Sequence, residues 1–243
     1  PLHVSPPFME SVSDDIAATL KSEVGNIDYR TRDKLFRQAI AEIDWSVGQI
    51  LDSLKANGLD ENTLVLFTSD NGPPKNSIFA SPGPLRGNKG TTLEGGMREP
   101  TVVRWPGKIP AGKPNDELMT SMDLLPTFAK LAGAAIPTDR VIDGKDIWPT
   151  LIGDAQTPHE AFFYHRGNQL QAARSGKWKL HTNNGRPTQL YDLESDIGEK
   201  KNVLQSHPEV VQRLSGYMKV FAKDIADNGR PAAFVENPKP LSK

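Results

Sequence analysis

Apolar residues recur every three or four positions in the segment TRDKLFRQAIAEIDWSVGQILDSLKANG, residues 31–58. The apolar positions are Leu35, Phe36, Ala39, Ile40, Ile43, Val47, Ile50, Leu51 and Leu54. This spacing gathers them on one face of an amphipathic helix. Thr31 or Asp33 can cap its beginning, and Asn57-Gly58 supplies a left-handed end.

Short apolar runs follow this helix. The run LVLF at residues 64–67 contains no polar residue, which is typical of a strand covered on both faces. A helix leading into such a strand favours an α/β fold with a parallel or mixed sheet flanked by helices. TVVRWPG at 101–107 predicts another strand. MDLLPTFAKLAG at 122–133 predicts a short helix, with Asp123 as N-cap and Gly133 at its end.

The pattern changes to alternation of apolar and polar residues after residue 158. FFYH, LQAARSG, KWKLHTN and TQLYDLE alternate apolar and polar residues between turn signals, which predicts four antiparallel strands. An amphipathic helix follows, with Val210, Leu214, Met218, Phe221 and Ile225 on one face. We therefore expect an α/β domain over residues 1–158 and a small C-terminal α+β domain with an extended tail over residues 159–243.

Composition excludes several classes of function. The 243 residues carry a formal net charge of −1, which does not favour nucleic acid or an anionic membrane as partner. The apolar run at 64–67 is too short to cross a bilayer. The absence of cysteine excludes disulfides, thiolate catalysis and Cys-based zinc sites. The chain starts at Pro1 rather than methionine, so we expect a processed protein or a piece of a longer one.

The first candidate chemistry lies at the end of the predicted strand 64–67, where Asp70 and Asn71 precede Gly72. Ligands bind beyond the carboxyl ends of strands in open parallel sheets. One charged and one neutral oxygen donor suit Ca²⁺ or Mg²⁺ better than a soft metal. The alternative is ordinary turn chemistry, for which Asp-Asn-Gly is well suited.

The second candidate is Lys89, in the glycine-rich stretch LRGNKGTTLEGGMREP. A lysine on a flexible loop is a point charge suited to an anionic oxygen, although a solvated surface loop is the alternative. Thr91 and Glu94 have capping-box spacing, which predicts a short helix beginning near the lysine. A Walker phosphate loop requires Gly-Lys-Ser/Thr, and the lysine here stands in Asn-Lys-Gly instead.

These motifs together carry a family resemblance. FTSDNGP, then LRGNKGTTLEGGMREP, then a strand ending WPG, resembles the sulfatase family of the alkaline-phosphatase superfamily. RSGKWKL and LYDLESD also resemble the second domain of that family. The resemblance runs from Pro1 to about Asp227 and covers only the later half of a sulfatase. It implies part of an alkaline-phosphatase-like sheet flanked by helices, plus a small C-terminal antiparallel sheet with one packed helix.

The resemblance also implies roles for individual residues. Asp70 and Asn71 match a pair of calcium ligands, with Mg²⁺ as the other candidate ion. Lys89 matches the lysine that contacts the sulfate ester, where its charge would offset the anion and the developing charge on the leaving oxygen. Arg98 and Glu99 match a family signature, and we interpret them as a structural buried ion pair.

Several family features are not found in this sequence. Sulfatases use a formylglycine made within Cys/Ser-x-Pro-x-Arg, and neither Ser5 nor Ser81 begins that pattern. We therefore expect the formylglycine in a missing N-terminal half of the same protein. Asp14-Asp15 follows no apolar strand, so it does not match the early metal-binding pair of the family. His3 is a neighbour of the position of the family's active-site histidine rather than its match.

The small C-terminal domain offers one weaker set of candidates. By resemblance, the hairpin carrying FFYHRGNQL can overhang the active-site cleft, so Tyr164, His165 and Asn168 are candidates to touch substrate. A surface-turn role is the alternative for each. The other histidines of this domain lack zinc-ligand spacing, and no role is predicted for them.

The expected function is calcium-dependent hydrolysis of aryl or glycan sulfate esters by the full-length enzyme, with this chain alone inactive. The expected partners are a sulfated small molecule or glycan and the missing N-terminal half, with no nucleic acid and no membrane. By resemblance, the location is periplasmic or secreted. Two alternatives stay open: a phosphoester or phosphonate hydrolase of the same superfamily, and a non-catalytic module that binds sulfated glycans.

Overall fold

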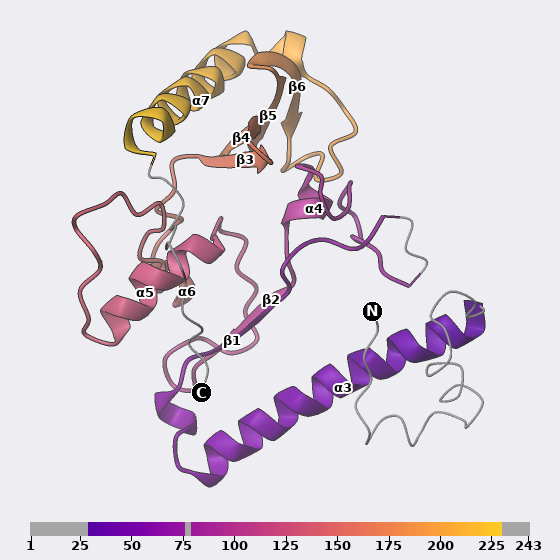
Figure 1. Cartoon of the computed structure of the whole chain (residues 1–243), viewed down its shortest axis with the longest axis vertical. Coiled ribbons are helices and arrows are strands. Elements are labelled where there is room, and N and C mark those ends of the chain that lie inside the picture. The colour runs from indigo at the N-terminus through magenta and orange to yellow at the C-terminus, as the bar shows by residue number, and fades with distance from the viewer. Residues whose placement is uncertain (1–28, 76–78, 230–243) are drawn as a thin grey trace, which may run out of the picture. The chain divides into compact units, whose positions relative to one another are not determined.

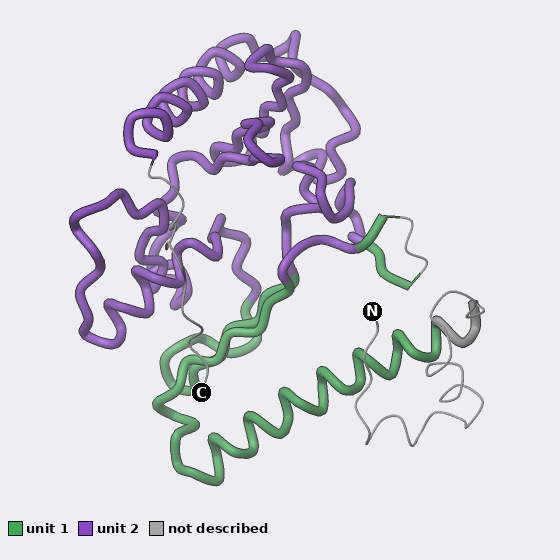
Figure 2. The backbone as a smooth tube through the Cα atoms, in the orientation of Figure 1, with its two compact units in different colours: residues 1–69, 74–81, 100–113 green, residues 70–73, 82–99, 114–243 purple. Residues whose placement is uncertain are grey.

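The computed structural model describes residues 29–75 and 79–229 (Figure 1). These residues form two compact units (Figure 2). The first unit contains residues up to 69 together with 74–81 and 100–113; the second contains 70–73, 82–99 and 114 onward. The positions discussed above at His3, Ser5 and Asp14-Asp15 lie outside the described residues. The division into domains at residue 158 stays a prediction.

A long helix leads the first unit. Helix α3 spans Tyr29–Ala56, and Gly58 ends it with a positive φ of 68°, as the sequence pattern predicts. The Gly58 and Leu59 N–H groups donate to the carbonyls of Lys55 and Leu54, at 3.1 and 2.9 Å. These bonds satisfy carbonyls that the helix itself leaves without donors.

The strands of this unit differ from the expectation. Strand β1 (Val65–Thr68) pairs antiparallel with β2 (Thr101–Arg104) in a two-stranded sheet. Phe67 is 43% exposed and Val102 is 64% exposed, so β1 is not covered on both faces in the described residues. The prediction of two strands is confirmed. The antiparallel pairing fits the mixed sheet that the sequence favours and not a purely parallel one. The expectation that β1 is covered on both faces is wrong within the described residues, which leave Phe67 open.

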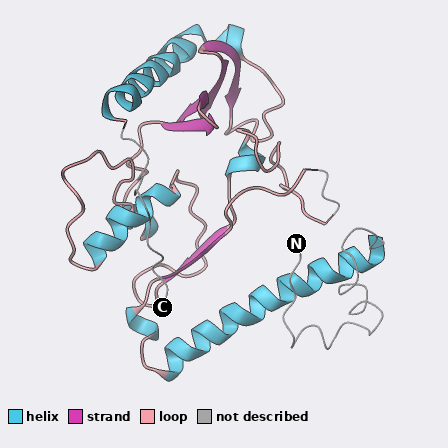
Figure 3. Ribbon diagram, in the orientation of Figure 1, coloured by secondary structure: helices cyan, strands magenta, loops and turns pink. Residues whose placement is uncertain are grey.

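The C-terminal sheet follows the alternating pattern closely. Its strands are β3 (Phe162–Arg166), β4 (Gln169–Ser175), β5 (Trp178–Asn183) and β6 (Arg186–Asp192), antiparallel in that order. Helix α7 (Pro208–Asn228) covers one face of this sheet (Figures 1 and 3). The core between them consists of Ala173, Leu180, Leu190, Val210, Leu214 and Met218. Ile225 is 48% exposed, so the buried stripe of α7 ends before it.

The segment between residues 114 and 160 is organised around a buried carboxylate. It contains η3 (Ser121–Asp123), α5 (Leu124–Leu131) and α6 (Trp148–Leu151). A further short helix, η4 (Leu204–Ser206), lies outside this segment, between β6 and α7. The Asp123 side chain makes no cap bond to α5; it accepts from the Thr120 and Lys145 N–H groups at 2.7 and 2.8 Å. Nε2 of His159 lies 2.8 Å from the same carboxylate. The sequence pattern therefore predicted the start of α5 correctly but did not predict the buried pair of Asp123 and His159.

None of the helices in the described residues combines the length and the apolar character that a membrane span requires.

Candidate functional site

The segment Asp70–Pro73 is fixed against a short helix, α4 (Glu94–Met97), within the second unit. The Gly72 N–H donates to the Gly96 carbonyl at 3.3 Å. A Cβ placed on Gly72 would lie 2.0 Å from the Gly95 carbonyl oxygen. Only glycine lets the two backbones approach this closely, so the residue that follows Asp70 and Asn71 sets their place against α4.

The loop that carries Lys89 is attached to the same segment. The Lys89 N–H donates to the Pro73 carbonyl at 2.9 Å. Gly87 and Gly90 on either side have φ values of +98° and +83°, which β-carbon sterics disfavour for other residues. The Lys89 side chain itself is exposed. The structure therefore places the chain segments of the metal candidates and of the sulfate-contact candidate next to one another.

The capping box predicted for this loop is not present. Helix α4 begins at Glu94, its N-cap is Leu93, and no side-chain cap bond is made. The Thr91 hydroxyl instead donates to the Asn88 carbonyl at 2.8 Å and closes the turn around Lys89. The Glu94 carboxylate does not cap the helix, because it pairs instead with cations such as Lys179 that are distant in the sequence. The local residue spacing could not reveal such partners.

The metal candidates fit a hard cation in kind but not in number. Asp70 is exposed and Asn71 is half-buried, and both present oxygen donors of the type that Ca²⁺ prefers. Among residues 29–75 and 79–229, no group of three or more His, Asp or Glu side chains is arranged to hold a metal ion. Two side-chain donors fall short of the six to eight oxygens of calcium, so a calcium ion bound here would need further ligands.

The hairpin candidates separate into two kinds. Tyr164 is only 2% exposed, and its hydroxyl donates to Glu94 Oε1 at 3.0 Å, so it is not available to a substrate. His165 is exposed near the end of β3, and its ring centroid lies 5.7 Å from that of Phe221 on α7. Asn168 lies exposed in the turn that follows. A substrate contact by His165 stays a prediction.

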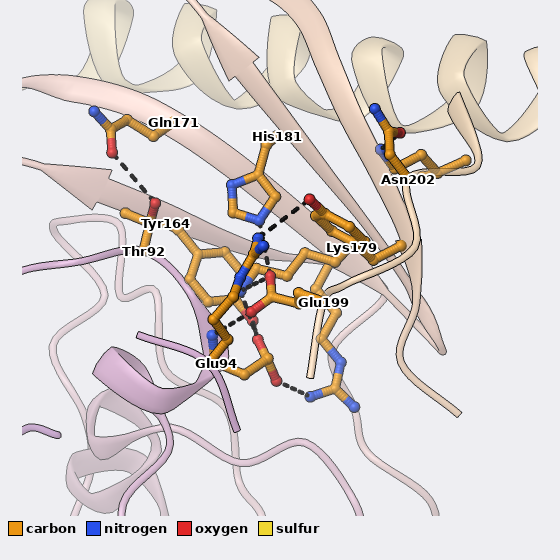
Figure 4. Close-up of polar contacts among 12 residues, drawn as sticks. Thr92, Glu94, Tyr164, Gln171, Lys179, His181, Glu199 and Asn202 are labelled. Carbon is orange, nitrogen blue, oxygen red and sulfur yellow. Dashed lines mark hydrogen bonds and ion pairs between the residues drawn. The ribbon is translucent and has the colours of Figure 1, made fainter. Parts of the chain in front are cut away.

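A largely buried group of charged and polar side chains, not anticipated from the sequence, lies at α4 (Figure 4). We call it the Lys179 cluster, and it consists of Glu94, Arg98, Tyr164, Arg174, Lys179, His181 and Glu199. Lys179 is fully buried, and its Nζ lies 2.7 Å from Glu94 and 3.1 Å from Glu199. Nε2 of His181 lies 2.9 Å from Glu199, which itself is fully buried. The available signal was the alternation in KWKLHTN, which puts Lys179 and His181 on the face opposite Leu180.

The cluster also corrects the expected partner of Arg98. The sequence-based interpretation paired Arg98 with Glu99, whereas Nε of Arg98 lies 2.6 Å from Glu94 Oε2. Glu94 begins α4 and Arg98 is its C-cap, four positions later, which brings their side chains together. Arg98 is therefore structural as expected, but its carboxylate partner is Glu94.

Electrostatics within the cluster favour ionised carboxylates. Burial alone would raise the pKa of Glu94, but the charges of Lys179 and Arg98 and their hydrogen bonds outweigh it and lower that pKa to about 2. Burial also opposes ionisation of Glu199, whose pKa is nevertheless lowered by the His181 hydrogen bond and the Lys179 charge. Burial, reinforced by the Glu94 charge, raises the pKa of Tyr164 well above its ordinary value. The tyrosine therefore remains a neutral donor.

Two protein-family models match the chain. One, described as Sulfatase, matches residues 10–134; the other, described as N-sulphoglucosamine sulphohydrolase, C-terminal, matches residues 88–224. Canine N-acetylgalactosamine-6-sulfatase is 47% identical over 152 residues, covering 60% of this chain and 28% of that protein. Human arylsulfatase A is 38% identical over 214 residues, covering 74% of this chain and 41% of that protein.

Solved structures agree with these matches. A structure described as Ps i-CgsB has a TM-score of 0.75 at 33% identity, covering 98% of this chain and 50% of that one. The PsFucS1 sulfatase from Pseudoalteromonas sp. has a TM-score of 0.72 at 27% identity, covering 80% and 44%. The chain thus spans half or less of the length of these relatives. Since the Sulfatase model alone matches just over half of its 243 residues, the chain belongs to the sulfatase family.

Proposed function

We propose that this chain supplies the later part of a sulfatase that hydrolyses sulfate esters with the help of a calcium ion. The observation that carries the proposal is the pair of backbone hydrogen bonds that join Gly72 to α4 and Lys89 to Pro73. They hold two oxygen donors and one exposed cation in neighbouring chain segments. A sulfate ester needs that combination, because its oxygens carry negative charge throughout the reaction.

Each residue then has a separate task. Asp70 and Asn71 would hold the cation, with Mg²⁺ as the alternative ion, and the cation when bound would supply positive charge next to the sulfate. Lys89 would contact a sulfate oxygen and offset charge that develops on the leaving oxygen. Its flanking glycines, Gly87 and Gly90, adopt the positive φ values of this turn without backbone strain, and the turn leaves Lys89 exposed. The formylglycine nucleophile would come from the region of the full-length protein that corresponds to the part of its relatives not matched by this chain.

A sulfated glycan is the substrate class that we favour over an aryl sulfate. One structural neighbour, 32% identical over 98% of this chain, is Ps i-CgsB in complex with k-i-k-neocarrahexaose, an oligosaccharide. Several relatives are named for sulfated sugars, among them N-acetylgalactosamine-6-sulfatase. We place the whole protein in the periplasm or outside the cell, on the basis of the family alone.

The full-length native protein provides the direct test. We expect Lys89→Ala to lower kcat/KM for a sulfate ester by about 10²- to 10³-fold, because one preorganised charge contact to the transition state is lost. Asp70→Asn should raise the calcium concentration needed for half-maximal rate. Lys89 is exposed, so the melting temperature should stay unchanged. The kcat/KM values for the sulfate and the phosphate monoester of one alcohol show which of the two esters the enzyme prefers.

Lys108→Ala is the matched control, because Lys108 is also an exposed lysine in a glycine-containing turn, after β2. It should leave both rate and melting temperature unaltered. Wild-type activity of Lys89→Ala would contradict the proposed role of Lys89. A preference for the phosphate ester would contradict the assignment to sulfate chemistry.

The chain of residues 1–243 by itself should not turn over an aryl sulfate. Its two candidate oxygen ligands fall short of a calcium shell, and no formylglycine motif stands in its sequence. Calorimetric titration with Ca²⁺ should accordingly give weak binding. Robust, calcium-dependent turnover by this polypeptide would show that the chemistry resides here and would overturn the division of labour proposed above.

A further inference from the structure

The Lys179 cluster is connected to the proposed site through Glu94, at the beginning of α4. Glu199 Oε2 accepts the backbone N–H of Glu94, the first residue of that helix, at 2.7 Å. The Glu94 side chain in turn accepts from Lys179 at 2.7 Å and from Tyr164 at 3.0 Å. Backbone and side chain of one residue are therefore both held by groups of the C-terminal sheet and the segment after it.

Helix α4 passes this constraint to the site. The Gly95 N–H donates to the Arg86 carbonyl at 2.7 Å, and the Gly96 carbonyl accepts the Gly72 N–H at 3.3 Å. Pro73, next to Gly72, accepts the Lys89 N–H at 2.9 Å. A continuous series of contacts thus runs from the buried Lys179 ammonium group of β5 to Gly72, beside the metal candidates, and to Lys89.

Glycine makes these contacts rigid rather than adjustable. A Cβ on Gly95 would lie 2.7 Å from the Arg86 carbonyl oxygen, and one on Gly96 would lie 2.5 Å from the Thr91 carbonyl oxygen. Backbones packed this closely cannot shift independently. A displacement of Glu94 is therefore expected to move the loop around Lys89 with it.

We propose that Lys179 and Glu199 are positioning residues of the sulfatase, which fix α4 and through it the Asp70–Pro73 segment and the Lys89 loop. This inference rests on the proposed function. A buried ion group is weak evidence for stability, because well-packed apolar side chains often do as well. A ring of directed hydrogen bonds around one helix start, however, specifies a position that apolar contacts would leave less defined.

Other contacts, made by residues outside the cluster, also hold the loop to the sheet. The Thr92 hydroxyl donates to Gln171 Oε1 at 3.2 Å (Figure 4), and Nη2 of Arg86 donates to the Tyr191 hydroxyl at 3.1 Å. They should keep the loop attached when the cluster is altered. Loss of Lys179 is therefore expected to loosen the loop locally rather than detach it.

The test uses the full-length native protein and its Lys179→Met and Glu199→Gln variants. Amide hydrogen exchange over residues 82–99 should become faster in both, with β6 and α7 less affected. Their kcat/KM for the sulfate ester should fall by about 10- to 100-fold, as for other groups that orient functional residues from behind. Glu199→Gln keeps an oxygen that can accept the Glu94 N–H, so it should be the milder variant and remain folded.

Lys177→Met is the matched control, because Lys177 precedes the same strand but has a 43% exposed side chain, which pairs with Asp192 and Glu194 instead of with the cluster. It should change neither exchange nor turnover. Unaltered exchange over residues 82–99 in Glu199→Gln, or faster exchange with wild-type turnover, would overturn the positioning role. Lys89→Ala measured alongside separates the two proposals, since its full activity would refute the proposed function whatever the exchange result.

Discussion

Replacing Gly72 by alanine is expected to abolish calcium-dependent turnover of the full-length protein and to lower its free energy of unfolding by about 3 kcal/mol. The new Cβ would lie 2.0 Å from the Gly95 carbonyl oxygen and 2.9 Å from the Gly96 Cα. Both are backbone atoms, so no side chain can rotate away. The Asp70–Pro73 segment would have to leave α4, which carries Asp70 and Asn71 out of place.

Urea unfolding and residual sulfate-ester turnover measure the two effects of this change. Gly216→Ala is the control, since Gly216 lies within α7 and a Cβ there meets nothing within 4 Å. Alanine in a helix interior should be neutral or stabilise the protein by up to about 1 kcal/mol. Wild-type stability and activity of Gly72→Ala would mean that the close approach of the two backbones is not needed.

Local periodicity was sufficient for much of the fold. The stripe in α3, the end of that helix at Gly58 and the alternation from β3 to β6 all depend on neighbours within a few residues. Burial was harder to predict. An apolar run such as that of β1 reports which side chains prefer to be covered, whereas the cover itself comes from other chain segments, and the described residues leave Phe67 open.

The candidate site depended on motif resemblance, because Asp70 and Lys89 share no periodic pattern. The structure added the backbone hydrogen bonds that make their segments neighbours. The Lys179 cluster could not be predicted in the same way. Glu94 is 85 residues from Lys179 and 105 from Glu199 along the chain, and its local spacing imitated a capping box. The one local sign was the position of Lys179 within an alternating strand. If that position is buried, the lysine needs a carboxylate partner.

The carboxylate of Glu94 is expected to govern stability in acid. Its pKa is about 2 in the folded protein against an ordinary value of 4.5, so its ionised form stabilises the fold above about pH 4.5. That contribution, about 3 kcal/mol from the size of the shift, is lost as the pH falls from about 4.5 towards 2. Glu94→Gln should therefore be less stable than wild type at pH 7 and should lose less stability on acidification.

Urea unfolding of the full-length protein between pH 3 and pH 7 measures this difference. Some acid dependence should remain in Glu94→Gln, because the pKa of Glu199 is also lowered, mainly by His181 and Lys179 acting against burial. Glu194→Gln is the control, since the Glu194 side chain is 75% exposed and pairs only with Lys177 among the described residues. Parallel pH profiles for wild type and Glu94→Gln would show that Lys179 and Arg98 do not hold Glu94 ionised, and would remove the electrostatic basis of the contact between the C-terminal sheet and α4.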